Sequence, residues 1–128
     1  MLSQFTPIPT LPTADLSKAR KFYEDTLGLT LQREAMDGLS YQCGDGTLFV
    51  YQSDYAGTNK ATAVTFEVPT SAFDTEVDAL RGEGVSFLTF ELEGVSWDNN
   101  GIASMGDLKA VWFTDPDGNI INVSAGDM

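Results

Sequence analysis

Three alternating runs of apolar and polar residues in the first half of the chain predict three short strands. In the last run, Leu48 and Val50 fall on one face of the expected strand, whereas Phe49 and Tyr51 fall on the other. An Asp-Gly pair separates each run from the next, and such a pair between alternating runs is a strong hairpin signal. We therefore predict strands at residues 29–35, 39–43 and 47–52.

A strand and a helix are expected before these hairpins. Residues 8–13 form an extended run interrupted by prolines, and because proline has no N–H to donate to a ladder, we place this strand at a sheet edge. Ala19 and Tyr23 then recur at helical spacing. Asp15 or Ser17 can cap the free amides at the start of this helix, and Gly28 can end it.

The second half of the chain repeats this order of elements. A strand is predicted at residues 61–68, and a helix follows in which Phe73, Val77 and Leu80 form the apolar stripe. Three further strands are expected at residues 86–91, 108–114 and 119–124. The order strand, helix, three strands thus occurs twice. It predicts one α+β domain of 128 residues with two βαβββ modules, at about residues 5–55 and 61–126.

The second half is longer than the first, and the excess lies around residues 92–107. Loops of this length inside a compact domain often carry function. Trp97 in this polar segment either closes over a pocket as a lid or packs the loop down, and the sequence leaves both interpretations open.

Residues 113–119, Phe-Thr-Asp-Pro-Asp-Gly-Asn, predict a tight turn between the last two strands. Pro116 presets φ for an early turn position, and Gly118 or Asn119 can take the positive φ that follows. Asp115 is therefore expected to form the turn rather than to bind a ligand. In the outgoing strand, Asn122 points away from the face that packs against the helix.

The net charge of −12 argues against nucleic-acid binding, because phosphate recognition needs clustered lysine and arginine. An acidic surface either serves solubility alone or helps to draw in a cationic ligand. No apolar run is long enough to cross a membrane, and no signal peptide is visible. The single cysteine, Cys43, permits no internal disulfide, so we expect a cytoplasmic protein.

The chain contains no histidine. This excludes Ser-His-Asp and Cys-His nucleophilic catalysis and every metal site that uses histidine. With one cysteine, a tetrahedral thiolate zinc site is excluded as well. Only an all-oxygen metal site remains, with residues 98–100, Asp-Asn-Asn, as one candidate for a hard cation.

The C-terminal turn resembles a signature of the vicinal oxygen chelate superfamily, which includes glyoxalases, bleomycin-resistance proteins and extradiol dioxygenases. The first helix is also similar, with Asp15-Leu16, Phe22-Tyr23 and Leu27-Gly28-Leu29 at the family's positions. The resemblance covers nearly the whole chain and implies two βαβββ modules. It further implies that their sheets curve into a cup-shaped cavity, with the helices outside.

The resemblance also locates the family's four metal-binding positions, and all four depart from the family pattern. They fall on Ile8, on Phe49 or Tyr51, on Ala63 and on Asn122, where family members carry a glutamate. Isoleucine, phenylalanine and alanine offer no donor to a divalent cation, Tyr51 could bind one only as a phenolate, and Asn122 is a weak carbonyl donor. We therefore expect no metal, no cofactor and no catalytic residue.

The residues expected to face the cup instead suggest a pocket for an organic ligand. Aromatic residues would stack on the ligand, Trp97 would close over it, and threonine and asparagine would orient it. Glu67 either pairs with a ligand amine or lies at the solvated end of its strand. The predicted ligand-binding residues are Thr10, Phe49, Tyr51, Thr65, Glu67, Trp97, Trp112 and Asn122.

The sequence therefore favours a metal-free protein that sequesters a partly aromatic or cationic small molecule, as bleomycin-resistance proteins do. The alternative is a glyoxalase-like or dioxygenase-like metalloenzyme with non-standard oxygen ligands. A third interpretation is an interaction module whose pocket is filled by its own aromatic side chains.

We also expect a homodimer, because the family often dimerises and the proline-rich first strand leaves an edge for a second chain. Size-exclusion chromatography at high protein concentration tests this expectation. An elution volume of a 13.9 kDa monomer would refute it.

Overall fold

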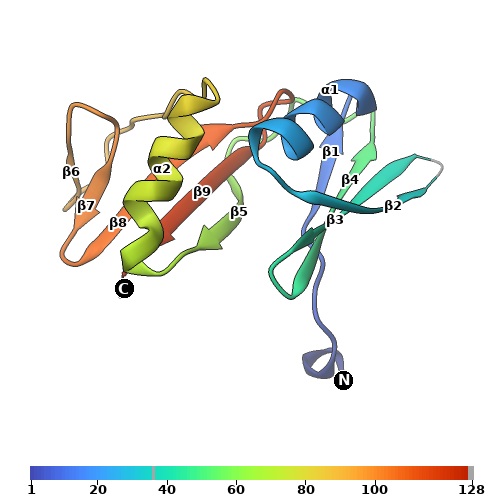
Figure 1. Ribbon diagram of the computed structural model, residues 1–128, viewed down its shortest axis with the longest axis horizontal. Helices are drawn as coiled ribbons and strands as arrows, with labels where there is room; N and C mark the ends of the chain where they lie inside the picture. Colours follow the sequence, from blue (N-terminus) through green and yellow to red (C-terminus); the bar gives the residue numbers. More distant parts are fainter. Residues whose placement is uncertain (36, 127–128) are drawn as a thin grey trace. The chain divides into compact units, whose positions relative to one another are not determined.

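The structure is a computed structural model that describes residues 1–35 and 37–126. It contains a four-stranded and a five-stranded sheet with a few helices, which confirms the predicted α+β class (Figure 1). The chain divides into two compact units. The first comprises Met1–Ala63 and Asp115–Asn119, and the second comprises Val64–Thr114 and Ile120–Met128.

The first unit contains the four-stranded sheet, in the order β1-β4-β3-β2. β1 pairs with β4 in parallel, and the other pairs are antiparallel. The proline-containing strand therefore lies at a sheet edge, as predicted. The elements of this unit are η1 (Leu2–Gln4), β1 (Thr10–Thr13), α1 (Leu16–Arg20), η2 (Lys21–Thr26), β2 (Thr30–Ala35), β3 (Gly38–Cys43) and β4 (Gly46–Gln52).

Helix α1 begins at the cap that the sequence predicts. The Asp15 carboxylate accepts hydrogen bonds from the backbone amides of Ser17 and Lys18, at 2.9 and 3.2 Å. The helix continues into η2 as a π-helical segment, and Gly28 follows with φ +72°. Ala19 and Tyr23 are fully buried on the side that packs against β3 and β4.

The alternation predicted for β4 is confirmed, and its consequence is a two-faced sheet. Leu48 and Val50 are buried with the core, whereas Phe49 and Tyr51 lie on the other face and are half-buried. The β3–β4 turn lies one residue earlier than expected: Cys43 pairs with Gly46, and Gly44 takes a positive φ of 54°. The Asp-Gly pair therefore overlaps the turn and the first position of β4.

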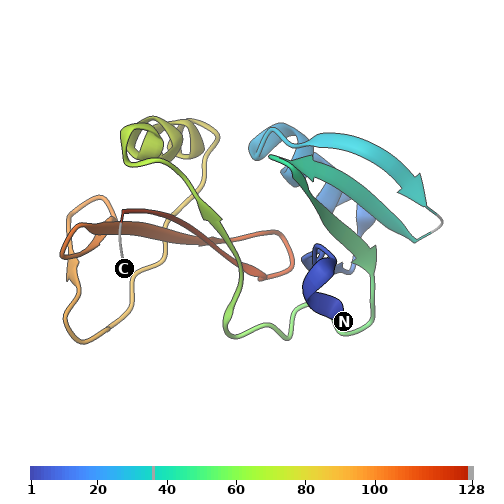
Figure 2. The ribbon, with the colours of Figure 1, turned by 90° about the horizontal axis from the view of Figure 1, so that it is seen from below.

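The second unit contains the five-stranded sheet, in the order β5-β9-β8-β7-β6. Helix α2 lies over one face of this sheet, as the two ribbon views show (Figures 1 and 2). Its predicted apolar stripe is confirmed, because Phe73, Val77 and Leu80 are buried. The elements are β5 (Thr62–Glu67), η3 (Thr70–Ala72), α2 (Phe73–Gly82), β6 (Ser96–Trp97), β7 (Ala103–Met105), β8 (Leu108–Thr114) and β9 (Ile120–Ala125).

The prediction of a strand at residues 86–91 is wrong. Only Leu88 forms a bridge, and its amide donates to the carbonyl of Trp112 at 2.8 Å. The edge of β8 along residues 108–110 is already occupied by β7, so this segment reaches β8 at one position only. The second module therefore consists of a strand, a helix and four strands.

The supposed loop at residues 92–107 instead contains the short hairpin β6–β7. Asp98 forms its turn, because its carboxylate accepts hydrogen bonds from the amides of Asn100 and Ile102, at 2.8 and 2.9 Å. Gly101 takes a positive φ of 83°, and Arg81 donates to the carbonyl of Asn100 at 2.7 Å. The Asp-Asn-Asn sequence is thus used to build a turn.

The turn between β8 and β9 belongs to the first unit and is organised by Asp115. The Asp115 carboxylate accepts hydrogen bonds from the amides of Asp117 and Asn119, from the Asn119 side chain and from the Tyr23 hydroxyl. Burial, together with the negative charge of Asp115, raises the pKa of Tyr23 far above its ordinary value. Gly118 supplies the positive φ, 82°. The expected role of Asp115 as a turn former is confirmed.

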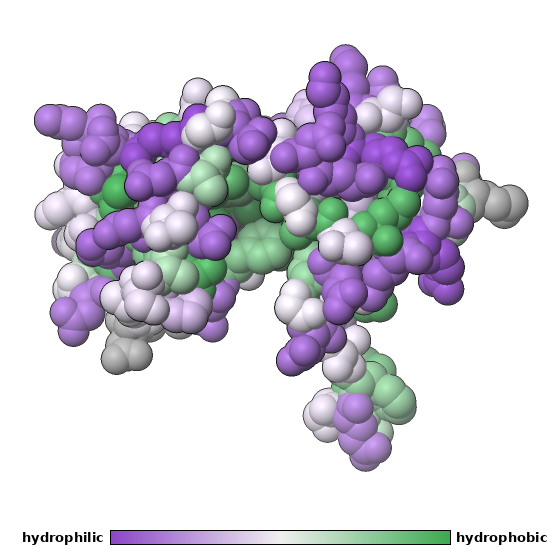
Figure 3. Space-filling model, in the orientation of Figure 1, coloured by the Kyte–Doolittle hydropathy of each residue, from purple (hydrophilic) through white to green (hydrophobic). Residues whose placement is uncertain are grey.

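Most of the face shown in Figure 3 is hydrophilic, as a net charge of −12 leads one to expect. The N-terminal segment differs, because Met1, Leu2, Phe5 and Ile8 are exposed apolar residues. Within residues 1–35 and 37–126, the structure has no helix that is long and apolar enough to cross a membrane.

Candidate functional site

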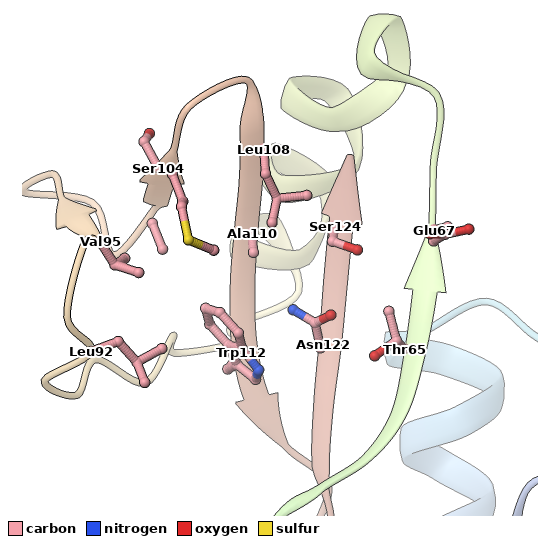
Figure 4. Close-up of a pocket in the computed structure, with 12 residues that line it drawn as sticks. Thr65, Glu67, Leu92, Val95, Ser104, Leu108, Ala110, Trp112, Asn122 and Ser124 are labelled. Carbon is pink, nitrogen blue, oxygen red and sulfur yellow. The ribbon is translucent and has the colours of Figure 1, made fainter. Parts of the chain in front are cut away.

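A cavity of about 550 Å³ lies in the second unit, on the face of the five-stranded sheet opposite helix α2 (Figure 4). Strand alternation explains its position. Val111 and Phe113 of β8 are buried with the core, so Ala110 and Trp112 point to the other face. The lining residues are Thr65, Glu67, Leu92, Val95, Ala103, Ser104, Met105, Leu108, Ala110, Trp112, Asn122 and Ser124.

Four of the predicted site residues meet in this cavity. They are Thr65 and Glu67 of β5, Trp112 of β8 and Asn122 of β9. Alternation could also have identified Ala110 and Ser124, because they share a face with Trp112 and Asn122. It could not have identified Leu92 and Val95, which come from the segment between α2 and β6 and owe their position to tertiary packing.

The cavity has an apolar side and a polar side. Figure 4 shows Leu92 and Val95 on one side of the ring of Trp112. The polar side chains of Asn122 and Thr65 lie on the opposite side, on β9 and β5. A molecule with a ring and a hydrogen-bonding group would find a matching surface for each part.

Asn122 is held in place by the backbone of the neighbouring strand. It is 6% exposed, and its Nδ2 donates to the carbonyl of Val111 at 3.0 Å. Its nitrogen points toward β8 and its oxygen toward β5 (Figure 4). This bond fixes the orientation of the amide, so the position presents a carbonyl oxygen on the side of Thr65.

Glu67 is the only charged residue among those that line the cavity. It is exposed at the end of β5, and its carboxylate points away from the cavity (Figure 4). This geometry matches the interpretation that Glu67 lies at the solvated end of its strand. A carboxylate at this position acts on a ligand across water, where ion pairs are weak.

Trp97 packs against two other aromatic rings and is absent from the cavity lining. Its ring centroid lies 5.2 Å from that of Phe90 and 5.7 Å from that of Trp112, and Phe90 and Trp112 are 5.0 Å apart. The half-buried Trp97 has no hydrogen-bond partner for its buried Nε1 in the part of the chain that the structure describes. The geometry favours packing over a lid, because the ring of Trp97 is held against those of Phe90 and Trp112.

The remaining predicted residues lie in the first unit. Thr10 and Phe49 line a hollow of about 500 Å³ on the four-stranded sheet. Tyr51 lines neither hollow, and its ring stacks on that of Phe49 with a centroid distance of 6.2 Å and an interplanar angle of 3°. Six of the eight predicted residues thus line one of these two hollows, whereas Tyr51 and Trp97 line neither.

A family model of the glyoxalase/bleomycin resistance protein/dioxygenase superfamily matches residues 4–123. The chain belongs to this superfamily. The resemblance of the turn at residues 113–119 and of the first helix is therefore confirmed. No curated protein matches the sequence.

Solved structures of superfamily type share the fold at low sequence identity. A glyoxalase/bleomycin resistance protein/dioxygenase from Alicyclobacillus acidocaldarius is 17% identical, with a TM-score of 0.73 over 94% of this chain and 90% of that chain. The fosfomycin resistance protein FosX from Listeria monocytogenes is 15% identical, with a TM-score of 0.75 over 100% and 94% of the two chains. A lactoylglutathione lyase from Agrobacterium tumefaciens is 18% identical, with a TM-score of 0.66 over 95% and 93%. At these identities the likeness establishes the fold alone.

The residues at the superfamily's metal positions do not fit a metal ion. Ile8, Phe49 and Ala63 carry no donor atoms, Tyr51 offers only a phenol, and Asn122 offers only a neutral amide oxygen. Within residues 1–35 and 37–126, no three Asp, Glu or Cys side chains gather in a group that could hold a metal. Burial raises the pKa of the Cys43 thiol, which disfavours the thiolate that metal binding and nucleophilic attack require.

Proposed function

We propose that this member of the superfamily binds a small, partly aromatic organic molecule in the cavity of the second unit, without a metal. The observation that supports this proposal is the division of the cavity into an apolar and a polar side. A volume of about 550 Å³ suits a molecule with one or two rings. The protein would sequester this molecule, in the manner suggested by the comparison with bleomycin-resistance proteins.

In this proposal several of the cavity residues have distinct roles in binding. Trp112 offers its ring for stacking, and Leu92 and Val95 cover the apolar part of the ligand. Asn122 and Thr65 orient the polar part through hydrogen bonds. Trp97 acts indirectly by holding the ring of Trp112 in place.

A cationic ligand is favoured over a neutral one, but only weakly. The net charge of −12 attracts cations over a distance, and Glu67 is the charged group nearest the cavity. Since Glu67 is exposed, we expect it to contribute at most about 1 kcal/mol to binding, or about fivefold in affinity.

Two probes of the same shape test this expectation. We expect 2-naphthylmethanol to bind and to quench tryptophan fluorescence, and 2-naphthylmethylamine to bind about two- to fivefold more tightly. Glu67→Gln should remove the difference between the probes and leave binding of the alcohol unchanged. If neither probe binds at millimolar concentration, the cavity is not a site for molecules of this class.

A metal titration separates this proposal from the metalloenzyme alternative. The chelator-treated protein is titrated calorimetrically with Mn²⁺, Fe²⁺, Ni²⁺, Zn²⁺ and Mg²⁺. We expect no stoichiometric site tighter than about 100 μM, which corresponds to roughly −5.5 kcal/mol. One tight site per chain would make a metal-dependent enzyme the better hypothesis.

We further propose that the chain forms a homodimer. Two features of the first unit support this. β1 is an edge strand, and Leu2, Phe5 and Ile8 in the segment that precedes it are exposed apolar residues.

A further inference from the structure

We propose that the hollow of the first unit binds the carboxylate of a small aromatic acid, with Arg33 as its ionic partner. The hollow measures about 500 Å³ and is formed by the face of the four-stranded sheet that carries Phe49. The proposal does not rest on the ligand proposed for the second unit. The lining residues are Ile8, Thr10, Gln32, Arg33, Ser40, Thr47 and Phe49.

The register of the sheet aligns four of these residues in one row. Arg33 of β2 pairs with Ser40 of β3, Ser40 pairs with Phe49 of β4, and Phe49 pairs with Thr10 of β1. Directly opposed residues of neighbouring strands point to the same face. The row therefore places a guanidinium, two hydroxyl groups and an aromatic ring on a single surface.

A bulge in β2 brings Arg33 into this row. Leu31 pairs with Tyr41, but the next pair joins Arg33 to Ser40, so Gln32 is an extra residue. In a regular ladder Gln32 would face Ser40, and Arg33 would point to the helix-covered side. Because of the bulge, Gln32 and Arg33 both line the hollow. Bulges are a common way to re-aim a side chain beside a functional site.

The uncharged polar groups around Arg33 supply further donors. The Thr47 hydroxyl donates to Oε1 of Gln32 at 3.3 Å, and the NH₂ group of Gln32 is a further donor. Ser40 is buried, with its side chain on the face of the hollow. The ring of Phe49 packs directly over Gly38, where a Cβ atom would collide with it, so the apolar wall is fixed by the sheet itself.

Arg33 is available for an anion in the part of the chain that the structure describes. Arg20 is paired with Glu24 and Glu34, and Arg81 with Asp78, whereas no described carboxylate lies within 4.0 Å of Arg33. One guanidinium matches one carboxylate in charge and in its two-pronged geometry. A phosphate dianion would need more positive charge than this single residue provides, on a chain of net charge −12. The geometry therefore favours a monocarboxylate whose ring contacts Phe49.

NMR titration of the ¹⁵N-labelled full-length protein tests the proposal with benzoate as the probe. We expect benzoate to shift the amides of Gln32, Ser40 and Thr47, with a Kd of about 1–10 mM. Benzamide, its neutral isostere, should bind at least about fivefold more weakly, and phenylphosphonate should bind no more tightly than benzoate. Benzoate shifts confined to other residues, equal binding of benzamide, or tighter binding of phenylphosphonate would each overturn the proposal.

Two variants with the same change in net charge test whether benzoate binding depends on Arg33 itself. Arg33→Gln should weaken benzoate binding about five- to tenfold, because it removes the direct ionic partner. Lys60→Gln removes an exposed positive charge outside the hollow and should change the Kd by less than about twofold. Arg33 is exposed, so both variants should fold, which the remaining amide shifts verify. If the two variants weaken benzoate binding equally, the weakening comes from the change in net charge, and a site at Arg33 is refuted.

Discussion

Replacing Asp115 with alanine is expected to lower the free energy of unfolding by about 3–5 kcal/mol. Asp115 is 4% exposed, and its carboxylate accepts four hydrogen bonds. The donors are the Tyr23 hydroxyl at 2.6 Å, the Asn119 side chain at 2.8 Å and the amides of Asp117 and Asn119 at 2.9 Å each. Alanine leaves these four donors without this acceptor, and three of the four hydrogen bonds are buried. Urea unfolding followed by circular dichroism measures the change.

Tyr23→Phe is the matched control for this prediction. It removes one of the four donors and leaves the carboxylate with three, so we expect a loss of about 1–2 kcal/mol. In the double variant the two losses should sum to more than the measured effect, because both remove the same hydrogen bond. An Asp115→Ala variant within about 1 kcal/mol of the wild type would show that the turn does not depend on this carboxylate.

Replacing Trp112 with alanine is expected to weaken binding of 2-naphthylmethanol about 10- to 30-fold, or about 1.4–2 kcal/mol. Trp112 is the one aromatic residue among those that line the cavity of the second unit. Its ring faces Leu92 and Val95 across the apolar side, so its loss removes a stacking surface and widens the cavity (Figure 4). Isothermal calorimetry, or line broadening of the probe in NMR for the weaker variant, measures the affinity.

The variant Trp97→Ala tests whether Trp97 contacts the ligand or only packs against the aromatic cluster. It removes a residue of the same size from the same aromatic cluster, but one that does not line the cavity. We expect the free energy of unfolding to fall. The Kd for 2-naphthylmethanol should change by less than about fivefold, since the ring of Trp112 keeps its neighbour Phe90. If Trp97→Ala abolishes binding while Trp112→Ala does not, Trp97 closes over the ligand and the assignment must be reversed.

The features that the sequence predicted correctly depend on contacts over a few residues. The Asp15 cap, the Gly28 and Gly118 turn positions and the alternation in β4 follow from local backbone preferences and from the period of a strand. The superfamily also followed from a local pattern, since the turn at residues 113–119 combines these preferences in a characteristic order.

The sequence predictions failed or stayed open where the outcome depends on segments that are distant in the sequence. Residues 86–91 have the pattern of a strand, but the hairpin β6–β7 pairs with β8 along the same edge. Trp97 was equally compatible with a lid and with packing, and only the positions of Phe90 and Trp112 favour the second. No local signal predicted that Leu92 and Val95 would line the cavity of the second unit.

The sequence by itself determined the α+β class, the superfamily and the edge position of β1. Each of these follows from residue identity and from short-range geometry. Only the tertiary structure decided which side chains share a surface. It placed Asn122 beside Trp112 and Arg33 beside Ser40, because strand register and a single bulge set those pairs. Register depends on the packing of whole strands, and one inserted residue reverses the face of every side chain beyond it.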